Sequence, residues 1–105
     1  MIIPKKEIMW LDQLNIDQKY RNKIIFINGK RYNLDALDSI TNTVYEFYGD
    51  YWHGNPKVFD SEKINMSNNK TFGQLYGNTI QRELFLKKMG YNIVHIWEYD
   101  FDMQG

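Results

Sequence analysis

The 105-residue chain contains no cysteine, which excludes disulfide bonds and every zinc site built on thiolate ligands. It has two histidines, and these could complete a protein zinc site only together with carboxylates. No apolar run approaches the length of a membrane span, and the first residues, MIIPKK, lack the long apolar core of a signal peptide. We therefore expect a soluble cytoplasmic protein that does not bind membranes.

The chain also lacks an excess of charge of either sign. Thirteen basic and thirteen acidic residues give a formal net charge of zero, which argues against a protein that holds nucleic acid mainly through bulk electrostatics. The local placement of charge must then carry any such binding. Lys57, Lys63 and Lys70 lie in a polar segment, where they are either part of a solvated loop or contacts for phosphate groups.

With 43% hydrophobic residues, a chain of this length can build one compact core and hardly two. Its pattern predicts a helix, three strands, a helix and a strand, in that order, which defines an α+β domain with a mixed sheet. The expected helices and strands cover residues 4–14, 23–27, 30–37, 43–48, 75–89 and 91–97. Asn28-Gly29 is a two-residue hairpin signal. The polar segment 54–73 is long for a connection in so small a domain, and such loops are usually functional or mobile.

The most informative residues stand at the end of the third expected strand, in the segment EFYGDYWHG (residues 46–54). Alternate side chains of a strand point to opposite faces, so Glu46 leaves the face on which Phe47 is buried and can meet Asp35 from the strand before it. Two converging carboxylates repel each other unless a cation lies between them, and such hard oxygen ligands suit Mg²⁺ or Mn²⁺. That is the chemistry of phosphodiester hydrolysis.

A third acid, Glu7, falls on the apolar stripe of the first expected helix, three and four residues before Trp10 and Leu11. An acid on an inward face is costly unless it is paired or binds a cation. Alternatively, Glu7 is a helix-start glutamate at the edge of the stripe, where the helix dipole favours it. The residues alone leave both interpretations open.

The chain resembles the core of the PD-(D/E)XK nuclease superfamily, a restriction-endonuclease-like fold. It shares with that core the order of its elements, an aspartate on the second strand (Asp35) and an acidic segment on the third (Glu46-Phe47-Tyr48). More narrowly, GDYWHG (residues 49–54) and GYNIVHIWE (residues 90–98) resemble the very-short-patch mismatch repair endonucleases and the phage homing endonucleases related to them. The match runs through nearly the whole chain. The resemblance implies that residues 1–105 are one catalytic domain of a DNA endonuclease. It would cut double-stranded DNA in the cytoplasm of a cell, or of the host if a phage encodes it.

Carried over position by position, the resemblance implies the parts of a metal-dependent site. Asp35, Glu46 and the backbone carbonyl of Phe47 would bind Mg²⁺, for which Mn²⁺ can substitute. Glu7 matches a first-helix glutamate that reaches metal-bound water. His53 matches a histidine that contacts the reacting phosphate or helps to move a proton. The products would carry 5′-phosphate and 3′-hydroxyl ends.

The same resemblance implies contacts with DNA. Tyr51 and Trp52 match aromatics that wedge into the DNA stack in the mismatch enzymes, and core packing is the alternative for both. Lys57 is the expected phosphate contact in the loop that follows. Arg82 and Glu83 resemble a charged pair of the family, so Arg82 is either a phosphate contact or a member of a surface ion pair.

The sequence departs from the family pattern at two positions. Tyr48 stands where the superfamily has a lysine, so His53, Lys30 or a second metal-bound water must orient the attacking water, or activity is lost. Asp50 stands where the mismatch enzymes have a zinc-binding cysteine, and we therefore expect no zinc. Asp50 is either a further acid of the active site or a turn residue whose side chain caps backbone amides.

Two other functions remain open at this stage. The missing lysine at position 48 favours a catalytically silent, nuclease-like module that only binds DNA, whereas the retained acids and His53 oppose it. The third possibility is a nuclease that acts on RNA. No helix-turn-helix, zinc finger or strongly basic helix is present to read the major groove. We therefore expect a separate DNA-binding segment to select the target, while the oligomeric state stays undetermined.

Overall fold

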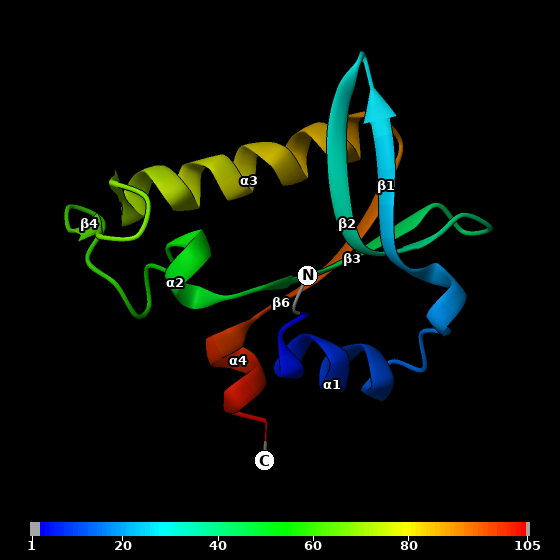
Figure 1. Ribbon diagram of the computed structural model, residues 1–105, viewed down its shortest axis with the longest axis horizontal. Coiled ribbons are helices and arrows are strands. Elements are labelled where there is room, and N and C mark those ends of the chain that lie inside the picture. The colour runs from blue at the N-terminus through cyan, green and yellow to red at the C-terminus, as the bar shows by residue number, and fades with distance from the viewer. Residues whose placement is uncertain (1–2, 105) are drawn as a thin grey trace.

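The computed structural model describes residues 3–104, which form an α+β fold around a four-stranded mixed sheet in the order β1-β2-β3-β6 (Figure 1). The strands are β1 (Arg21–Ile27), β2 (Lys30–Asp38), β3 (Thr43–Tyr48) and β6 (Asn92–Trp97). The helices are α1 (Lys5–Gln13), α2 (Asp50–His53), α3 (Phe72–Lys88) and α4 (Glu98–Asp102). A short 3-10 helix (Gln18–Tyr20) and a two-stranded sheet of β4 (Ile64–Asn65) and β5 (Lys70–Thr71) complete the described chain.

The expected α+β class with a mixed sheet is confirmed, and each expected helix and strand is present within a few residues. Asn28 and Gly29 have φ values of 52° and 79°, the left-handed conformation that the predicted hairpin turn requires. Helix α3 begins three residues earlier than predicted, because Thr71 and Gln74 form a capping box before its first turn. Among the described residues, no helix is both long enough and apolar enough to cross a membrane.

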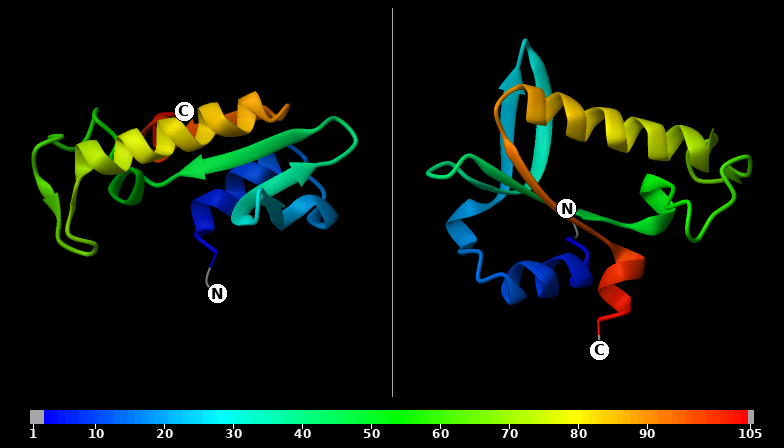
Figure 2. Two further views of the ribbon diagram at one scale, coloured as in Figure 1. Left: turned by 90° about the horizontal axis from the view of Figure 1, so that it is seen from above. Right: turned by 180° about the vertical axis from the view of Figure 1, so that it is seen from behind.

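Helices α1 and α3 lie on opposite sides of the sheet (Figure 2). On the α1 side, the core consists of Trp10, Leu11, Ala36, Phe47 and Phe101. On the α3 side, it consists of Tyr32, Leu34, Val44 and Leu86. Successive side chains of β3 alternate between the two clusters, as the pleat of a strand dictates. Strand β3 is thus buried on both faces, and a polar side chain along it needs a partner.

Strand β2 separates from β3 at Asp35. The two strands pair only from Ala36 to Asp38, whereas β1 and β2 remain paired to the hairpin turn. Asn22, which faces Asp35 across the hairpin, has a φ of 55°, and Leu34 and Ala36 pack into different core clusters although strict alternation would place them together. The hairpin therefore bends here and stands away from β3 (Figure 1). This bend opens the sheet beside the acids.

Two short helices that the sequence pattern did not predict begin where β3 and β6 end, and each caps the other. The backbone N–H of Tyr99 in α4 donates to Asp50 Oδ1, and that of Asp50 in α2 donates to Glu98 Oε1, both with N···O distances of 3.2 Å. Carboxylates are favoured there because the first amides of a helix are unpaired. Asp50 also accepts a 2.8 Å hydrogen bond from Asn55 and is buried. Of its two possible roles, the structure shows capping.

The segment between α2 and α3 is folded around a small core of its own. The rings of Phe59 and Phe72 stack with their centroids 4.3 Å apart. Asn65 is completely buried, and its Nδ2 donates to the backbone oxygen of Tyr51 over 2.9 Å. This loop is therefore tied to α2, which carries His53.

Candidate active site

Carboxyl groups from α1, β2 and β3 converge where β2 leaves β3. The backbone N–H of Phe47 donates to Asp35 Oδ2 over 2.7 Å, and the backbone N–H of Asp35 donates to Glu46 Oε2 over 3.3 Å. These two bonds to side chains take the place of the strand pairing that the bend interrupts. Glu7 of α1 lies close enough to Asp35 for its charge to act on the Asp35 carboxyl group. The structure thus brings together the three acids expected from the sequence.

The environment of these acids favours their protonated forms. Burial, followed by the nearby charge of Glu7, raises the pKa of Asp35 to about 7. Burial likewise raises the pKa of Glu46 to about 7, although the guanidinium of Arg82 acts in the opposite direction. Burial also raises the pKa of Glu7. Buried carboxyl groups this close hold protons unless a cation replaces them.

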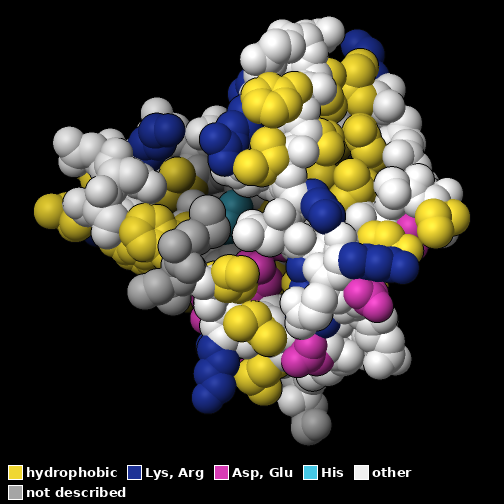
Figure 3. All heavy atoms as spheres, turned by 45° about the vertical axis from the view of Figure 1, so that its right-hand side comes forward, with side chains coloured by type: hydrophobic (Ala, Val, Ile, Leu, Met, Phe, Trp, Pro, Cys, Tyr) yellow, Lys and Arg dark blue, Asp and Glu magenta, His cyan; other side chains and the backbone are white. Residues whose placement is uncertain are grey.

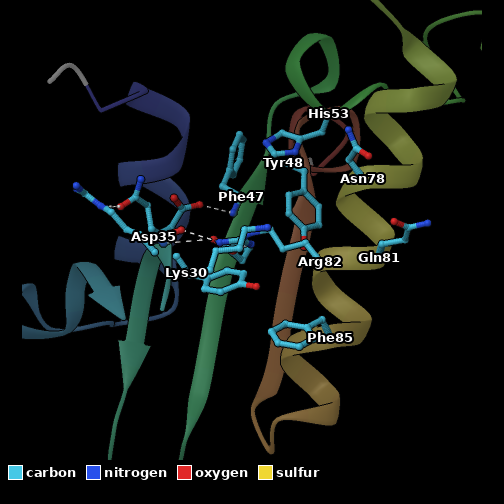
Figure 4. Close-up of a pocket in the computed structure, with 13 residues that line it drawn as sticks. Lys30, Asp35, Phe47, Tyr48, His53, Asn78, Gln81, Arg82 and Phe85 are labelled. Atoms are coloured by element: carbon cyan, nitrogen blue, oxygen red, sulfur yellow. Dashed lines mark hydrogen bonds and ion pairs between the residues drawn. The ribbon is translucent and has the colours of Figure 1, made fainter. Parts of the chain in front are cut away.

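Arg82 of α3 supplies positive charge to the acid cluster. Its guanidinium donates to Glu46 Oε1 and, over 2.7 Å, to the backbone oxygen of Asn33 on β2 (Figure 4). It also lies 6.0 Å from the centre of the Tyr32 ring. Arg82 therefore links α3 to both β3 and β2. Of the two roles left open for it, the surface ion pair with Glu83 is not formed.

The acids lie where two clefts meet. A cleft of about 830 Å³ runs between the β1–β2 hairpin and α3, and a second of about 590 Å³ is walled by α1 and α2. Both are lined by Asp35, Phe47 and His53. In a space-filling view, acidic side chains and a histidine lie in a hollow near the middle of one face, with basic side chains around it (Figure 3). An extended polymer could thus pass over the acids through both clefts.

His53 ends α2 and lines both clefts. Its Nδ1 lies 2.9 Å from Thr79 Oγ1 on α3. Burial, together with the positive charge of Arg82, lowers the pKa of His53 to about 4. The imidazole is therefore neutral at pH 7, where it can accept a proton but has none to spare for a leaving group.

The two aromatic residues before His53 have different surroundings. Trp52 is 58% exposed and lines the second cleft, as a contact for DNA requires. The ring of Tyr51 packs edge-on against Phe59 and Phe72, and its hydroxyl lies 2.8 Å from Ser67 Oγ. Tyr51 therefore holds the α2–α3 loop in place, whatever else it contacts.

The lysine expected to contact phosphate is paired within the protein. Lys57 Nζ lies 3.3 Å from Asp100 Oδ1 and 5.8 Å from the centre of the Tyr99 ring. Other basic side chains, Lys30 and Arg31, line the larger cleft beside the acids. The sequence pattern suggested Lys30 only as a substitute for the missing lysine and indicated no role for Arg31. Their position after the Asn28-Gly29 turn places them on the hairpin that forms one wall.

Tyr48, at the position of the superfamily lysine, extends toward α3. Its hydroxyl donates to Glu83 Oε1 over 3.0 Å, and His95 Nδ1 lies 2.6 Å from the same oxygen. Lys87 Nζ lies 3.3 Å from the other oxygen, so the buried Glu83 ties α3 to β3 and β6. The sequence pattern did not predict this network. One feature of the sequence pointed to it: Glu83 lies on the same buried stripe of α3 as Leu75, Thr79 and Leu86.

The donor chemistry of the acid cluster fits a hard divalent cation, because buried carboxyl groups with raised pKa values gain from exchanging their protons for such an ion. Within residues 3–104, no three acidic or histidine side chains stand in the geometry of a finished metal site. Glu46 binds Arg82 instead. Metal binding would therefore require Glu46 to exchange the guanidinium for the ion.

The raised pKa values predict how the stability of the metal-free protein depends on pH. Asp35 and Glu46 bind protons more tightly in the folded chain than in the unfolded chain. Their stabilising contribution to the free energy of unfolding is therefore fully present below pH 4 and is lost as pH rises through 7. Asp35→Asn removes one of these groups. We expect its thermal midpoint to rise relative to that of the unmodified protein, by at least ~5 °C, between pH 6 and pH 8.5. Calorimetry in EDTA measures this difference between the two midpoints. His53, whose pKa is lowered, changes stability with pH in the opposite direction, but it does so in both proteins and therefore cancels in the difference. A constant difference would contradict the pKa assignment.

No protein-family model, no curated protein and no solved structure matches the chain.

Proposed function

We propose that this protein is a metal-dependent endonuclease that hydrolyses phosphodiester bonds in double-stranded DNA. Its fold would be restriction-endonuclease-like, and its chemistry that of the mismatch-repair and homing nucleases that its sequence resembles. The convergence of Glu7, Asp35 and Glu46 at the junction of two clefts carries the proposal. Such a cluster, in which Glu46 is buried and Glu7 and Asp35 are half-buried, opposes the stability of the metal-free fold, which is typical of a functional site.

In this proposal Asp35, Glu46 and the backbone carbonyl of Phe47 hold Mg²⁺ or Mn²⁺. When bound, the ion polarises the scissile phosphate and lowers the pKa of a water molecule. Glu7 orients the attacking water from the side of α1. His53, neutral at pH 7, accepts a proton from that water. The water oxygen bonds to phosphorus while the bond between phosphorus and O3′ breaks, which leaves a 5′-phosphate and a 3′-hydroxyl.

Arg82 would provide the positive charge that the tyrosine at position 48 cannot. Its guanidinium already lies against Glu46 and faces the larger cleft. With Glu46 serving as a metal ligand, the guanidinium would be free to bind a non-bridging oxygen of the scissile phosphate, where it would stabilise the charge that develops. Lys30 and Arg31 would hold the backbone of the same DNA further along the cleft.

A catalytically silent DNA-binding module is the second candidate. The ion pair between Arg82 and Glu46 favours it, because that pair satisfies the acid without a metal ion. Incubation of supercoiled plasmid with the protein in Mg²⁺ or in EDTA distinguishes the two functions. The endonuclease gives nicked or linear DNA only in Mg²⁺. A silent module retains the plasmid on a gel without cutting it, and would overturn the proposed activity.

Trp52 is expected to strengthen the binding of duplex DNA. Because its side chain is 58% exposed, Trp52→Ala should leave the thermal midpoint nearly unchanged. Loss of one stacking contact should weaken binding about tenfold and reduce any preference for mismatched or flexible steps. Fluorescence anisotropy of labelled duplexes measures both effects. Phe26→Ala is the control, since Phe26 is also an exposed aromatic residue, 69% exposed, but lines neither cleft. Equal affinities of the two variants would argue against a contact by Trp52.

A further inference from the structure

The histidine at the junction of the clefts is bound to a buried threonine. His53 Nδ1 lies 2.9 Å from Thr79 Oγ1, and the same hydroxyl lies 3.0 Å from the backbone oxygen of Leu75, one turn earlier in α3. Thr79 is only 6% exposed. Its hydroxyl therefore has two protein partners at hydrogen-bond distance.

These two contacts determine where the hydrogens lie. A threonine hydroxyl has one hydrogen, and the carbonyl oxygen of Leu75 can only accept it. If the hydrogen pointed elsewhere, two oxygens would face each other at 3.0 Å with no hydrogen between them. With its hydrogen on Leu75, Thr79 Oγ1 can only accept from His53, so Nδ1 carries the ring proton.

We propose that Thr79 is a positioning residue that fixes His53 as the Nδ1–H tautomer and leaves the lone pair of Nε2 free to accept a proton. The inference rests on the proposed function in its catalytic part, because Nε2 would take the proton of the attacking water as the oxygen bonds to phosphorus. The departing O3′ would take its proton from solvent. An Nε2–H tautomer could not act in this way.

The surroundings of His53 keep its ring in this arrangement. Its ring centre lies 5.0 Å from that of Tyr48 and 6.5 Å from that of Trp97, so aromatic side chains pack around it. The ring projects from α2 into the cleft that Phe47 and Arg82 also line, with Phe47 on one side and α3 on the other (Figure 4). Burial and the charge of Arg82 lower the pKa of His53 to about 4, which keeps the ring neutral.

Nitrogen NMR of the ring tests the assignment without any need for activity. Protein labelled with ¹⁵N-histidine contains two labelled rings, and His53→Gln identifies the signals of His53. At pH 7 we expect the proton on Nδ1 and an unprotonated Nε2. Thr79→Val, which keeps the shape of the side chain without the hydroxyl, should shift the ring toward Nε2–H, whereas Thr79→Ser should not. Thr43→Val is the control, because Thr43 is a buried threonine away from both clefts.

An Nε2–H ring in the unmodified protein would overturn the proposal, and so would a Thr79→Val ring that keeps its proton on Nδ1. In single-turnover experiments, Thr79→Val should cleave DNA about tenfold more slowly, the equivalent of one hydrogen bond. Its affinity for DNA should be unchanged, and Thr79→Ser should recover the normal rate. A loss of affinity at an unchanged rate would also contradict it. If the unmodified protein has the Nδ1–H ring but cuts no DNA, the nuclease assignment fails and the role of Thr79 in fixing the tautomer stands.

Discussion

Asp35→Asn is expected to abolish cleavage of duplex DNA while the chain remains folded. The substitution removes a charged ligand, and the several kcal/mol of stabilisation that a metal ion supplies corresponds to roughly a thousandfold or more in rate. The fold should tolerate it, because the amide oxygen of asparagine can still accept from the backbone N–H of Phe47. Single-turnover cleavage of a plasmid in Mg²⁺, with calorimetry of the same sample, measures both effects.

Asp38→Asn is the matched control for this experiment. Asp38 lies on the same strand and is the same residue type, but it lines neither cleft and caps the turn after β2 through the amides of Ile40 and Thr41. This variant should cut DNA at the normal rate. Undiminished cleavage by folded Asp35→Asn would show that Asp35 binds no catalytic metal.

His53→Ala should slow the cleavage of bound DNA by roughly a hundredfold to ten-thousandfold, the usual range for a lost acid or base. The affinity for DNA should change little, since a neutral imidazole contributes no charge to phosphate binding. Saturating single-turnover kinetics separate the two quantities. The other histidine provides the control, because His95 pairs with Glu83, and His95→Ala should lower the thermal midpoint rather than the rate.

A fall in affinity together with an unchanged rate on bound DNA would make His53 a binding residue only. That result would also remove the basis for a catalytic role of Thr79.

Two simple periodicities point the acids inward, although for Glu7 the residues alone left the helix-start alternative open. Strand alternation directs Glu46 away from the face of Phe47, and the helical stripe with Trp10 and Leu11 carries Glu7. The sequence could not show how Asp35 meets them. That contact depends on the bend of the hairpin at Asn22, a single left-handed residue without a distinctive pattern.

Partners that are distant in sequence account for the other differences. Arg82 reaches Glu46 because α3 packs across the sheet, and nothing local to Arg82 reveals this. Helices α2 and α4 exist because Asp50 and Glu98 cap each other's helices, so neither needs a periodic apolar pattern. Tyr51 packs into the small core of the loop, which was the alternative to a contact with DNA, and its partners Phe59 and Phe72 lie too far along the chain for the local sequence to decide between the two roles.

Titration of the metal-free protein with Mn²⁺, followed by the electron paramagnetic resonance signal of the free ion, tests directly whether the acid cluster holds a catalytic cation. We expect the unmodified protein to bind Mn²⁺ at pH 8 and more weakly at pH 6, where Asp35 and Glu46 retain protons. Asp35→Asn should lose this binding, and Asp38→Asn should keep it. Equal binding by the unmodified protein and Asp35→Asn, or no binding even with duplex DNA present, would contradict a metal-dependent active site at these residues.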